Sequence, residues 1–442
     1  MSADGSRAHV VQALAYITLG LFAGALIAEL SRPGASAPPA PGTPGPAVAG
    51  PPAPAADAGI AKMRGVVSHS NPAEMQQLLA LGYFVGTVDP EADKSGVLAH
   101  DKRRSWPGLN FYHSELGRSA LLVDMDGSEV YRWELGKEPD LGTWKHAELS
   151  PNGDLTVLVR DKRVFRIDKH SKLQWVREMR AHHDLWIHDN GEIYVLVRNP
   201  RRMPHVHPSA AVLDDGIQVL SAVGEPLRRV SLSDLLERSR YRFLRRSIAH
   251  IVADAAGGDL DLMHSNHIEV FDGSQAHRGP LYARGNMLVS MRNNHSIAIL
   301  SGSDHEFLWL WGPSNLTFQH HPVLLDNGNV LVFSNGTTKS RVYEVNPPSN
   351  TIVWQYGHPD FFSKTRGSNQ RLPNGNTLIT ESDIGHVLEV TRAGETVWHF
   401  ANPDVDGELR HAIWRMTRHA REDLPFLSAR LPPDGPPEPP KR

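Results

Sequence analysis

Short apolar runs with a two-residue alternation recur along the chain from Ser119 onward. Runs such as LTVLV, EIYVLV, MLVSM, VLVF and TLIT each follow a turn pair of Asn and Gly. The five pairs are Asn152-Gly153, Asn190-Gly191, Gly285-Asn286, Asn327-Gly328 and Asn374-Gly375. Because Gly and Asn tolerate the positive φ that tight turns need, such pairs between apolar runs predict β-hairpins. The pattern predicts an all-β chain built from repeated hairpins.

The turn pairs recur at intervals of 38, 95, 42 and 47 residues. Four-stranded propeller blades repeat at about 40 to 50 residues, so three of the four intervals match one blade each. The interval of 95 fits a blade with a large insertion, which the helical pattern of Ser233 to Asp254 places at about 231–256. The arginines of this insertion indicate either a solvated helix face or a contact with a membrane surface or a partner. They are Arg238, Arg240, Arg242, Arg245 and Arg246.

The two ends of the repeat region are predicted to share one blade. Ser119 to Leu135 supplies only the third and fourth strands of a blade, with Asp126-Gly127 as its hairpin turn. His411 to Arg418, near the C-terminus, supplies the missing inner strand. Five complete units and this shared unit predict a six-bladed β-propeller at 108–428. Closure by both ends leaves fewer open sheet edges.

Tryptophan recurs in a strand at the end of most units. Large aromatic side chains at one position per repeat are typical of the packing between blades. We therefore expect a structural role for these residues, which are Trp133, Trp175, Trp309, Trp311, Trp354 and Trp398.

The N-terminal region differs in composition. Residues 10–28 carry no charged side chain, and a helix of this length at ~1.5 Å per residue crosses one hydrocarbon core. We predict a short cytoplasmic tail at 1–9, a transmembrane anchor at 10–30 and a Pro/Ala-rich linker at 31–60. The alternative is a cleaved signal peptide, since Ala35-Ser36-Ala37 has the small-x-small pattern. Both interpretations place the remainder outside the cytoplasm, on the periplasmic side, and the anchor makes the membrane a partner.

Residues 61–107 are predicted as a helical lead-in to the propeller. The helix is expected to begin at Asn71, because Asn is a good N-cap, Pro72 suits the first helical position and Glu74 the third. The Pro-rich tail at 429–442 is predicted to be disordered.

Composition excludes several classes of chemistry. The chain has no cysteine, which rules out disulfides, thiol catalysis and Cys-ligated zinc. The formal charge of −3 provides no global field for nucleic acid. The sequence contains no His-Glu-x-x-His motif, no phosphate-binding loop and no calcium loop. We therefore expect no metal and no cofactor, and the oligomeric state stays undetermined.

Histidines occupy equivalent positions in four of the units. Aligned on their turns, the units carry a histidine at or next to the start of the innermost strand, which lines the channel of a propeller. Imidazoles in a channel serve metal binding or acid, base and nucleophilic chemistry near neutral pH. Arg341, in the same unit as two of them, favours an oxyanion substrate, since guanidinium binds sulfate, phosphate or carboxylate oxygens and repels a metal. The histidines are His146, His183, His264, His267, His320 and His321.

The chain resembles the arylsulfotransferases of the arylsulfate sulfotransferase type over roughly Gly108 to Trp414. The motifs that carry the resemblance are NFYHSE with ALLVDMDGSEVYRW, HSNHIEV, QHHPVLLDNGNVLVFSNG with SRVYEV, and GSNQRLPNGNTLITES with VLEVTRAGETVWHF. The resemblance implies a six-bladed, usually exported propeller. Its members move a sulfuryl group from a phenolic ester to another phenol without a nucleotide donor.

The resemblance also implies roles for individual residues. His264 matches the channel histidine of the family's H-x-N motif, with Asn266 beside it. His320 matches the histidine of the Q-H motif, and Arg341 the arginine that holds sulfuryl oxygens. The implied mechanism is a ping-pong cycle, in which an imidazole nitrogen attacks sulfur and a second phenol then takes the group. His183 and His321 are predicted as further substrate-binding side chains.

One expected histidine is absent. The family's transferring histidine belongs to the inner strand after the arginine-bearing blade, where this chain has Gly367-Ser368-Asn369. His411, at the start of the closing strand, is the predicted substitute. The alternative function is a non-catalytic extracytoplasmic propeller that binds a ligand or an envelope partner.

Overall fold

The computed structural model describes residues 86–114, 117–136, 140–244 and 260–428. All of these residues belong to one compact unit. The predicted cytoplasmic tail, anchor and linker, the helix expected from Asn71 and the C-terminal tail lie outside the described residues. Within these described ranges, no helix has the length and apolar character needed to cross a membrane.

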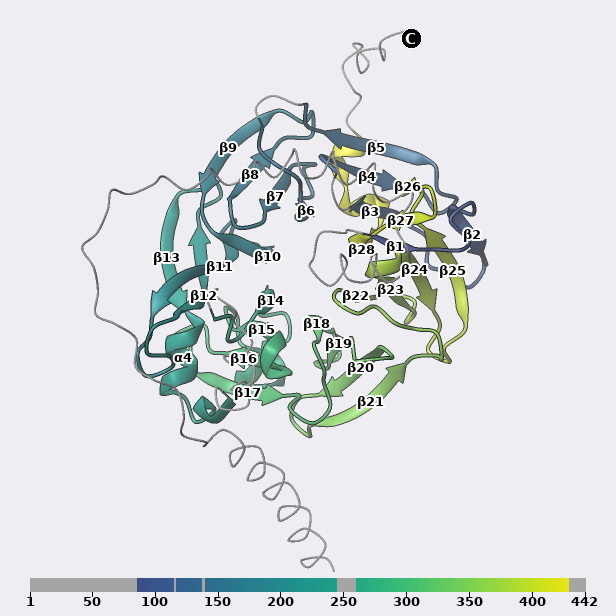
Figure 1. Cartoon of the computed structure of the whole chain (residues 1–442). Helices are drawn as coiled ribbons and strands as arrows, with labels where there is room; N and C mark the ends of the chain where they lie inside the picture. The colour runs from purple at the N-terminus through teal and green to yellow at the C-terminus, as the bar shows by residue number, and fades with distance from the viewer. Residues whose placement is uncertain (1–85, 115–116, 137–139, 245–259, 429–442) are drawn as a thin grey trace, which may run out of the picture. The chain divides into compact units, whose positions relative to one another are not determined.

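Six sheets of four or five strands surround a common centre (Figure 1). Each sheet is given from its innermost strand outward. The first three sheets are β28 (Ile413–His419), β3 (Leu109–Ser114), β4 (Ser119–Val123) and β5 (Glu129–Glu134); β6 (His146–Leu149), β7 (Leu155–Val159), β8 (Arg163–Ile167) and β9 (Leu173–Glu178); and β10 (Ala181–Ile187), β11 (Ile193–Arg202), β12 (Ala211–Leu220) and β13 (Pro226–Ser231). The other three are β14 (Ser265–Val270), β15 (Met287–Met291), β16 (Ser296–Leu300) and β17 (Phe307–Trp311); β18 (His320–Leu324), β19 (Val330–Ser334), β20 (Arg341–Asn346) and β21 (Thr351–Tyr356); and β22 (Ser368–Arg371), β23 (Thr377–Glu381), β24 (His386–Val390), β25 (Thr396–Ala401) and β2 (Gly96–His100).

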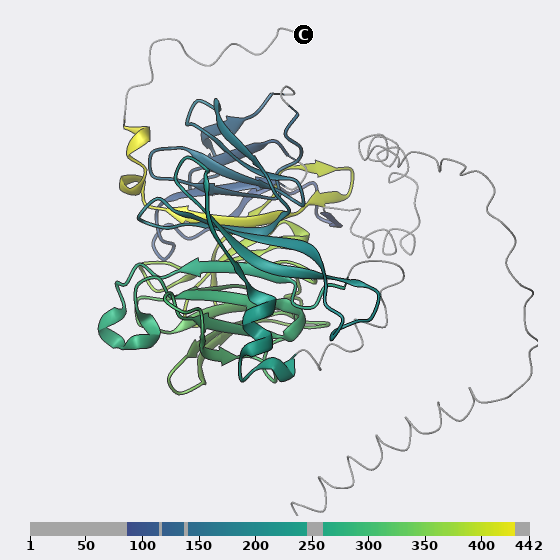
Figure 2. The same cartoon turned by 90° about the vertical axis from the view of Figure 1, so that its left-hand side faces the viewer.

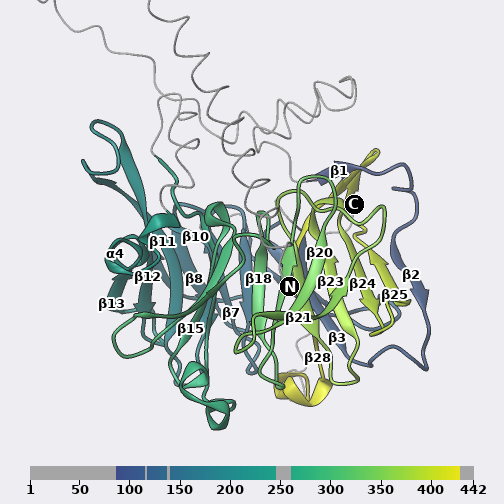
Figure 3. The ribbon, with the colours of Figure 1, turned by 90° about the horizontal axis from the view of Figure 1, so that it is seen from below.

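Smaller elements decorate this arrangement. β1 (Gly86–Val88), β27 (Leu409–His411) and β26 (Val405–Asp406) form a three-stranded sheet. Figure 3 shows β1 and the long β11–β12 hairpin at one end of the ring, and the turns after β28 at the other. The helices are α4 (Leu232–Arg238) and the 3-10 turns η2 (Ala276–Arg278), η3 (Pro280–Tyr282), η4 (Arg292–Asn294), η5 (Ser382–Ile384), η6 (Arg421–Asp423) and η7 (Pro425–Leu427).

Apolar side chains fill the spaces between neighbouring sheets. Six buried clusters draw their residues from successive pairs of sheets. One of them joins the last sheet to the first, where Phe400 of β25 meets Tyr112 of β3 in an edge-to-face contact at 5.3 Å between ring centroids. Figure 2 shows the same ring from the side. The expected all-β, propeller-like class is confirmed by this arrangement.

The C-terminal strand closes the ring as predicted. β28 is the innermost strand of the sheet that contains β3, β4 and β5, so one sheet holds segments from both ends of the described chain. β3 was not anticipated as a strand, and it provides the second position of this sheet. His411 is not part of β28, because it lies in β27 and pairs with Gly86 of β1.

Two predicted helical regions are corrected. The described part of the 61–107 lead-in forms β1 and β2, and β2 adds a fifth strand to the outer edge of β25. Coverage of a sheet edge by a further strand removes unpaired backbone groups, which explains why this segment pairs instead of coiling. In the insertion, α4 begins after the N-cap Ser231 and ends at Arg238, well short of Asp254, and residues 245–259 lie outside the described ranges.

The repeated turns and tryptophans behave as the sequence indicates. At the β18–β19 turn, Gly328 has φ of 81°, and its N–H donates to the Leu325 carbonyl at 2.8 Å. The glycine alone takes the positive φ, which gives a hairpin with a bulge. The tryptophans of the outer strands reach the next sheet: Trp133 Nε1 donates to the Gly153 carbonyl at 2.8 Å and Trp354 Nε1 to the Arg392 carbonyl at 2.9 Å. Their predicted structural role is confirmed.

Candidate active site

The histidines of the innermost strands stand on unusual backbone. His183, His264 and His321 have φ values of 59°, 50° and 47°, which non-glycine residues adopt uncommonly. The ladders of β10, β14 and β18 with their neighbours each shift register close to these residues. Bulges of this kind re-aim side chains and cluster near active sites. Local backbone geometry therefore turns these imidazoles toward the centre of the ring.

His320 is held in one tautomer. Its Nδ1 lies 2.7 Å from Asn335 Oδ1 and 3.0 Å from the Phe318 carbonyl oxygen, and both partners are acceptors. The Asn335 amide is oriented by its own donor group, which donates to the carbonyls of Ser363 at 2.7 Å and Arg366 at 2.8 Å. Nδ1 must therefore carry the hydrogen, which leaves a lone pair on Nε2 of the neutral ring.

Electrostatics keeps this ring neutral. Burial, and then the nearby guanidinium of Arg292 and the imidazole of His264, lower the pKa of His320 to about 3. At neutral pH the side chain is thus an unprotonated imidazole with a defined nucleophilic nitrogen.

A small cavity adjoins His320. Its enclosed volume is about 10 Å³, room for about one water molecule, and its empty space with the open mouth included is about 240 Å³. Two guanidinium groups among the lining side chains favour an oxyanion. The lining residues are Asn266, His320, His321, Arg366, Gly367, Ser368, Trp414 and Arg415.

Both arginines are anchored by carboxylates. Arg366 Nη1 donates to Asp383 Oδ1 at 2.9 Å, and Arg415 Nη2 donates to Asp184 Oδ1 at 3.0 Å. Anchored guanidinium groups lose little freedom when an anion binds, which is the basis of preorganised electrostatic stabilisation. The cavity therefore offers fixed positive charge beside a nucleophilic nitrogen.

Asp184 connects four of the innermost strands. Asp184 belongs to β10, and its carboxylate forms an ion pair with Arg415 of β28. The carboxylate also lies 2.6 Å from Nδ1 of His267 in β14 and 3.3 Å from Nε2 of His146 in β6. The backbone N–H of Ile268 also donates to it at 3.3 Å. Burial by itself would raise the pKa of Asp184, but Arg415 and His267 outweigh it and hold that pKa below its usual range. The carboxylate is therefore charged and central to the ring.

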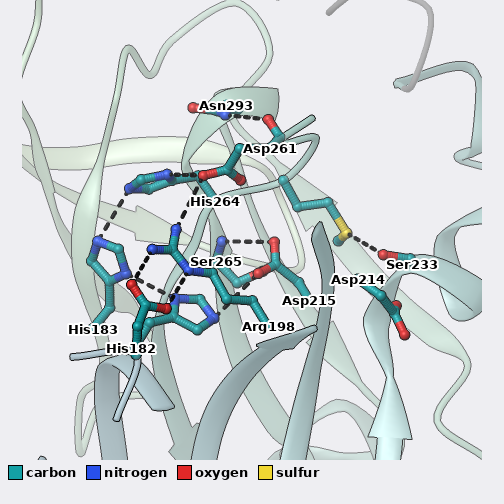
Figure 4. Close-up of polar contacts among 12 residues, drawn as sticks. His182, His183, Arg198, Asp214, Asp215, Ser233, Asp261, His264, Ser265 and Asn293 are labelled. Carbon is teal, nitrogen blue, oxygen red and sulfur yellow. Dashed lines mark hydrogen bonds and ion pairs between the residues drawn. The ribbon is translucent and has the colours of Figure 1, made fainter. Parts of the chain in front are cut away.

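The structure brings most of the predicted site residues together. His320, His321 and Asn266 line the cavity. His264 and His183 contact each other, with 3.1 Å between their Nε2 atoms (Figure 4). The Nδ1 of His321 accepts the backbone N–H of Asn369 at 3.3 Å, which ties it to β22.

Two predicted residues lie elsewhere. Arg341 begins β20, the third strand from the centre, and its Nη1 donates to the Ser340 carbonyl at 2.9 Å beside Gly357. His411 lies in the three-stranded sheet with its Nδ1 3.0 Å from Asp404 Oδ2. Neither residue lines the cavity of His320. Only the innermost strand of each sheet faces the centre. Arg341 belongs to the third strand of its sheet, and His411 precedes β28, so neither residue has a position on an innermost strand.

Sequence reasoning missed the residues that take the place of Arg341. Arg366 immediately precedes Gly367-Ser368-Asn369, so alignment of strand starts would have included it, and Arg415 lies inside the predicted closing strand. Asn335 gave no signal of its own. A Cβ on Gly367 would approach the Phe333 ring to 2.5 Å, which explains why a larger residue does not occur at this cavity position.

The donor set was also tested for a metal centre. In the described ranges, no group of three or more His, Asp or Glu side chains has the arrangement needed to hold a metal ion.

Buried imidazoles give the fold a pH-dependent stability. Burial lowers the pKa of seven histidines, so the unfolded chain takes up protons below about pH 6.5 while the folded chain does not. Stability from these groups is complete above that pH and is lost as pH falls, by up to about 1.4 kcal/mol per pH unit for each. The histidines are His183, His267, His320, His321, His386, His399 and His419.

Two buried carboxyls act in the opposite direction. Burial raises the pKa of Glu269 to about 8 and that of Glu381 to about 7, so their contribution is lost as pH rises above about 4.5. Because seven groups oppose two, we expect the free energy of unfolding, measured with urea, to be lower at pH 5 than at pH 6.5. An equal or higher value at pH 5 would contradict the buried, neutral state of these histidines.

The described part of the chain is an all-β, propeller-like protein whose innermost strands bring histidines and arginines around a small cavity. The arylsulfotransferase (ASST) family profile matches residues 153–403, more than half of the chain, and the chain belongs to this family. It is therefore arylsulfotransferase-like in general function. No curated protein sequence matches it.

Several solved structures share limited similarity with the chain. A protein of unknown function from Bacteroides caccae is 14% identical, with 71% of this chain and 99% of that chain covered and a TM-score of 0.46. A functionally unknown protein from Desulfotomaculum acetoxidans is 13% identical, with 71% and 99% covered and a TM-score of 0.42. A streptogramin B lyase is 11% identical, with 76% and 96% covered and a TM-score of 0.43. At these scores the similarities carry no inference about function.

Proposed function

We propose that the protein moves a sulfuryl group from an aryl sulfate to a phenol through a covalent intermediate on His320 Nε2. One observation carries the proposal: Asn335 and the Phe318 carbonyl hold the hydrogen of His320 on Nδ1, so the neutral ring presents a lone pair on Nε2. Membership of the arylsulfotransferase family supplies the substrate class, and no nucleotide donor or cofactor is invoked.

The chemistry balances with residues of this chain alone. Nε2 of neutral His320 attacks sulfur, the S–N bond forms, and the S–O bond to the aryl group breaks to release phenolate. The sulfuryl-imidazolium keeps its Nδ1 hydrogen, which remains bonded to Asn335. A second phenol gives its proton to the phenolate that has left, its oxygen attacks sulfur, and the S–N bond breaks to restore neutral His320. Arg366 and Arg415 offset charge on the equatorial oxygens in both steps.

We also propose that the six larger sheets are the blades of one six-bladed propeller, with 108–428 as its extent. The six interleaved apolar clusters support this number.

The membrane anchor at 10–30 and a periplasmic location are further proposals, supported by the uncharged run at 10–28. Release of the protein from membranes by alkaline carbonate would contradict the anchor.

Acceptor-dependent turnover tests the function. The full-length protein is incubated with 4-nitrophenyl sulfate, with and without a panel of phenols, and nitrophenol release is followed. We expect release beyond one equivalent only when a phenol is present, and an 80-Da mass increase on a peptide that contains His320. The absence of turnover with every acceptor would favour a non-catalytic propeller that binds a ligand.

A further inference from the structure

Three imidazoles and two carboxylates form a continuous chain beside the cavity (Figure 4). Asp261 Oδ2 lies 2.6 Å from Nδ1 of His264, and Nε2 of His264 lies 3.1 Å from Nε2 of His183. The other nitrogen of His183, Nδ1, lies 2.8 Å from Nδ1 of His182. At the far end, Nε2 of His182 makes an ion-pair contact of 3.2 Å with Asp215 Oδ1, wider than the contact at the Asp261 end. We call these five residues the imidazole chain.

Proton counting shows that this chain carries one extra proton. Each of the two N–N contacts needs one hydrogen, because two facing lone pairs would repel. Nδ1 of His264 needs one to bond Asp261 at 2.6 Å. Nε2 of His182 makes no aligned hydrogen bond to Asp215, but a bare lone pair 3.2 Å from that carboxylate oxygen would be repelled, so this nitrogen needs one as well. Four hydrogens are required, whereas three neutral imidazoles carry three. The chain therefore holds one positive charge between two carboxylates.

This charge has two equivalent locations. With the extra proton on His264, that ring donates to His183, which donates to His182. Transfer of one hydrogen across each N–N contact moves the charge to His182 and reverses both hydrogen bonds. Burial, and then the neighbouring His264 and His182, lower the pKa of His183 well below its usual value, so the charge resides on the outer rings.

Surrounding charges hold the two ends. Arg198 pairs with Asp161 at 2.6 Å and reaches Asp261 at 3.5 Å. Burial would raise the pKa of Asp261, but His264 and Arg198 outweigh it and keep the carboxylate charged. At the other end, Asp215 accepts the Ser265 backbone N–H at 3.2 Å. Arg160 and Lys145 also act on His183, and Arg292 acts on Asp261.

Only one end of the chain reaches open space. The side chain of His264 is 21% exposed, whereas that of His182 is 1% exposed. His183 lies 6.0 Å, between ring centroids, from Trp414, which lines the cavity of His320. The charge of His264 also acts on His320. The chain thus reaches solvent at His264 and is buried at His182.

We propose that the imidazole chain is the proton store of the transfer reaction, with His183, His182 and Asp215 as positioning residues that keep the proton until His264 delivers it. The inference rests on the proposed function. When phenolate leaves sulfur, the chain gives its extra proton to the phenolate oxygen. The acceptor phenol later returns one proton as its oxygen attacks sulfur, so the cycle leaves the proton count unchanged. The Asp215 carboxylate stabilises the charged chain without contact with the substrate.

Asp215→Asn tests the proposal because it removes a carboxylate from the buried end of the chain. The matched control is Asp214→Asn, since Asp214 is the adjacent buried carboxylate and bonds Ser231 and Arg229 outside the chain. Both variants are compared with the wild type on 4-nitrophenyl sulfate and on 4-methylphenyl sulfate. The second substrate has a far more basic leaving group and needs the proton during S–O cleavage.

We expect Asp215→Asn to lower kcat/KM for 4-methylphenyl sulfate by about 10²-fold or more and that for 4-nitrophenyl sulfate by less than about 10-fold. Asp214→Asn should lower both equally and little. Equal losses on the two substrates in Asp215→Asn, or the same pattern in both variants, would overturn the proton store. The 80-Da adduct on His320 from 4-nitrophenyl sulfate should persist in Asp215→Asn, and its absence from the wild type would instead refute the proposed function.

Discussion

Replacement of His320 by alanine is expected to abolish transfer of the sulfuryl group. The substitution removes the only nitrogen that the cavity presents as an oriented lone pair, so kcat/KM should fall by at least about 10⁴-fold. Arg366 and Arg415 remain in place, and binding of the aryl sulfate should change far less. Nitrophenol release measures the loss of transfer, and peptide mass spectrometry measures the loss of the 80-Da adduct on the peptide that contains position 320.

The control for this variant is His188→Ala. His188 is also buried and follows β10, but its Nε2 pairs with Asp189 at 3.2 Å away from the cavity. It should retain near wild-type turnover. An 80-Da adduct in wild-type protein on His264 or His321, with none on His320, would assign the covalent step to another imidazole.

Removal of the Asp184 carboxylate is expected to cost about 3–5 kcal/mol of folding free energy in Asp184→Ala. The reason is that Arg415 and the imidazoles of His146 and His267 share this buried carboxylate. Among the described residues, its loss leaves Arg415 with only the 3.9 Å contact to the partly exposed Glu148. Because Asp184 and its three partners belong to four different innermost strands, the substitution should weaken the contacts between several sheets at once. Equilibrium unfolding of the full-length protein in urea gives the magnitude.

Asp189→Ala is the matched control for stability. Asp189 pairs with Arg284 and His188, but its side chain is 49% exposed, and exposed ion pairs contribute about 0–1 kcal/mol. If Asp184→Ala is no less stable than Asp189→Ala, the Asp184 network contributes nothing to the closure of the ring.

The repeated hairpins were accessible to sequence analysis because each is a local feature. Gly328 and its equivalents mark turns by their φ alone, and the tryptophans mark outer strands because packing demands one large side chain per repeat. Closure by β28 also followed from counting strands. The helical prediction failed over 86–107, the described part of the lead-in, because β2 pairs with β25 about 300 positions away in sequence and no local period reports such pairing.

The site was only partly accessible. The histidine positions were found because innermost strands begin at equivalent places, and His320, His321 and Asn266 indeed line one cavity. Arg341 was assigned to the site because it belongs to the same unit as His320 and matches the family's arginine for sulfuryl oxygens. The structure separates them, since successive strands of a hairpin step outward from the centre, and Arg366 and Arg415 from the two following sheets line the cavity instead.

The sequence by itself determined the all-β class, the repeat, the family resemblance and the presence of histidines near a common centre, because each depends on turn chemistry or on short-range periodicity. Only the tertiary structure decided which nitrogen of His320 bears its hydrogen, which arginines face it and how His264, His183 and His182 share one proton. These properties depend on side-chain contacts of about 3 Å, of which His264–His183 joins two sheets and the other two lie within one sheet each. Such contacts arise only when the ring forms, since the backbone of each sheet sets the direction of side chains that no local pattern encodes.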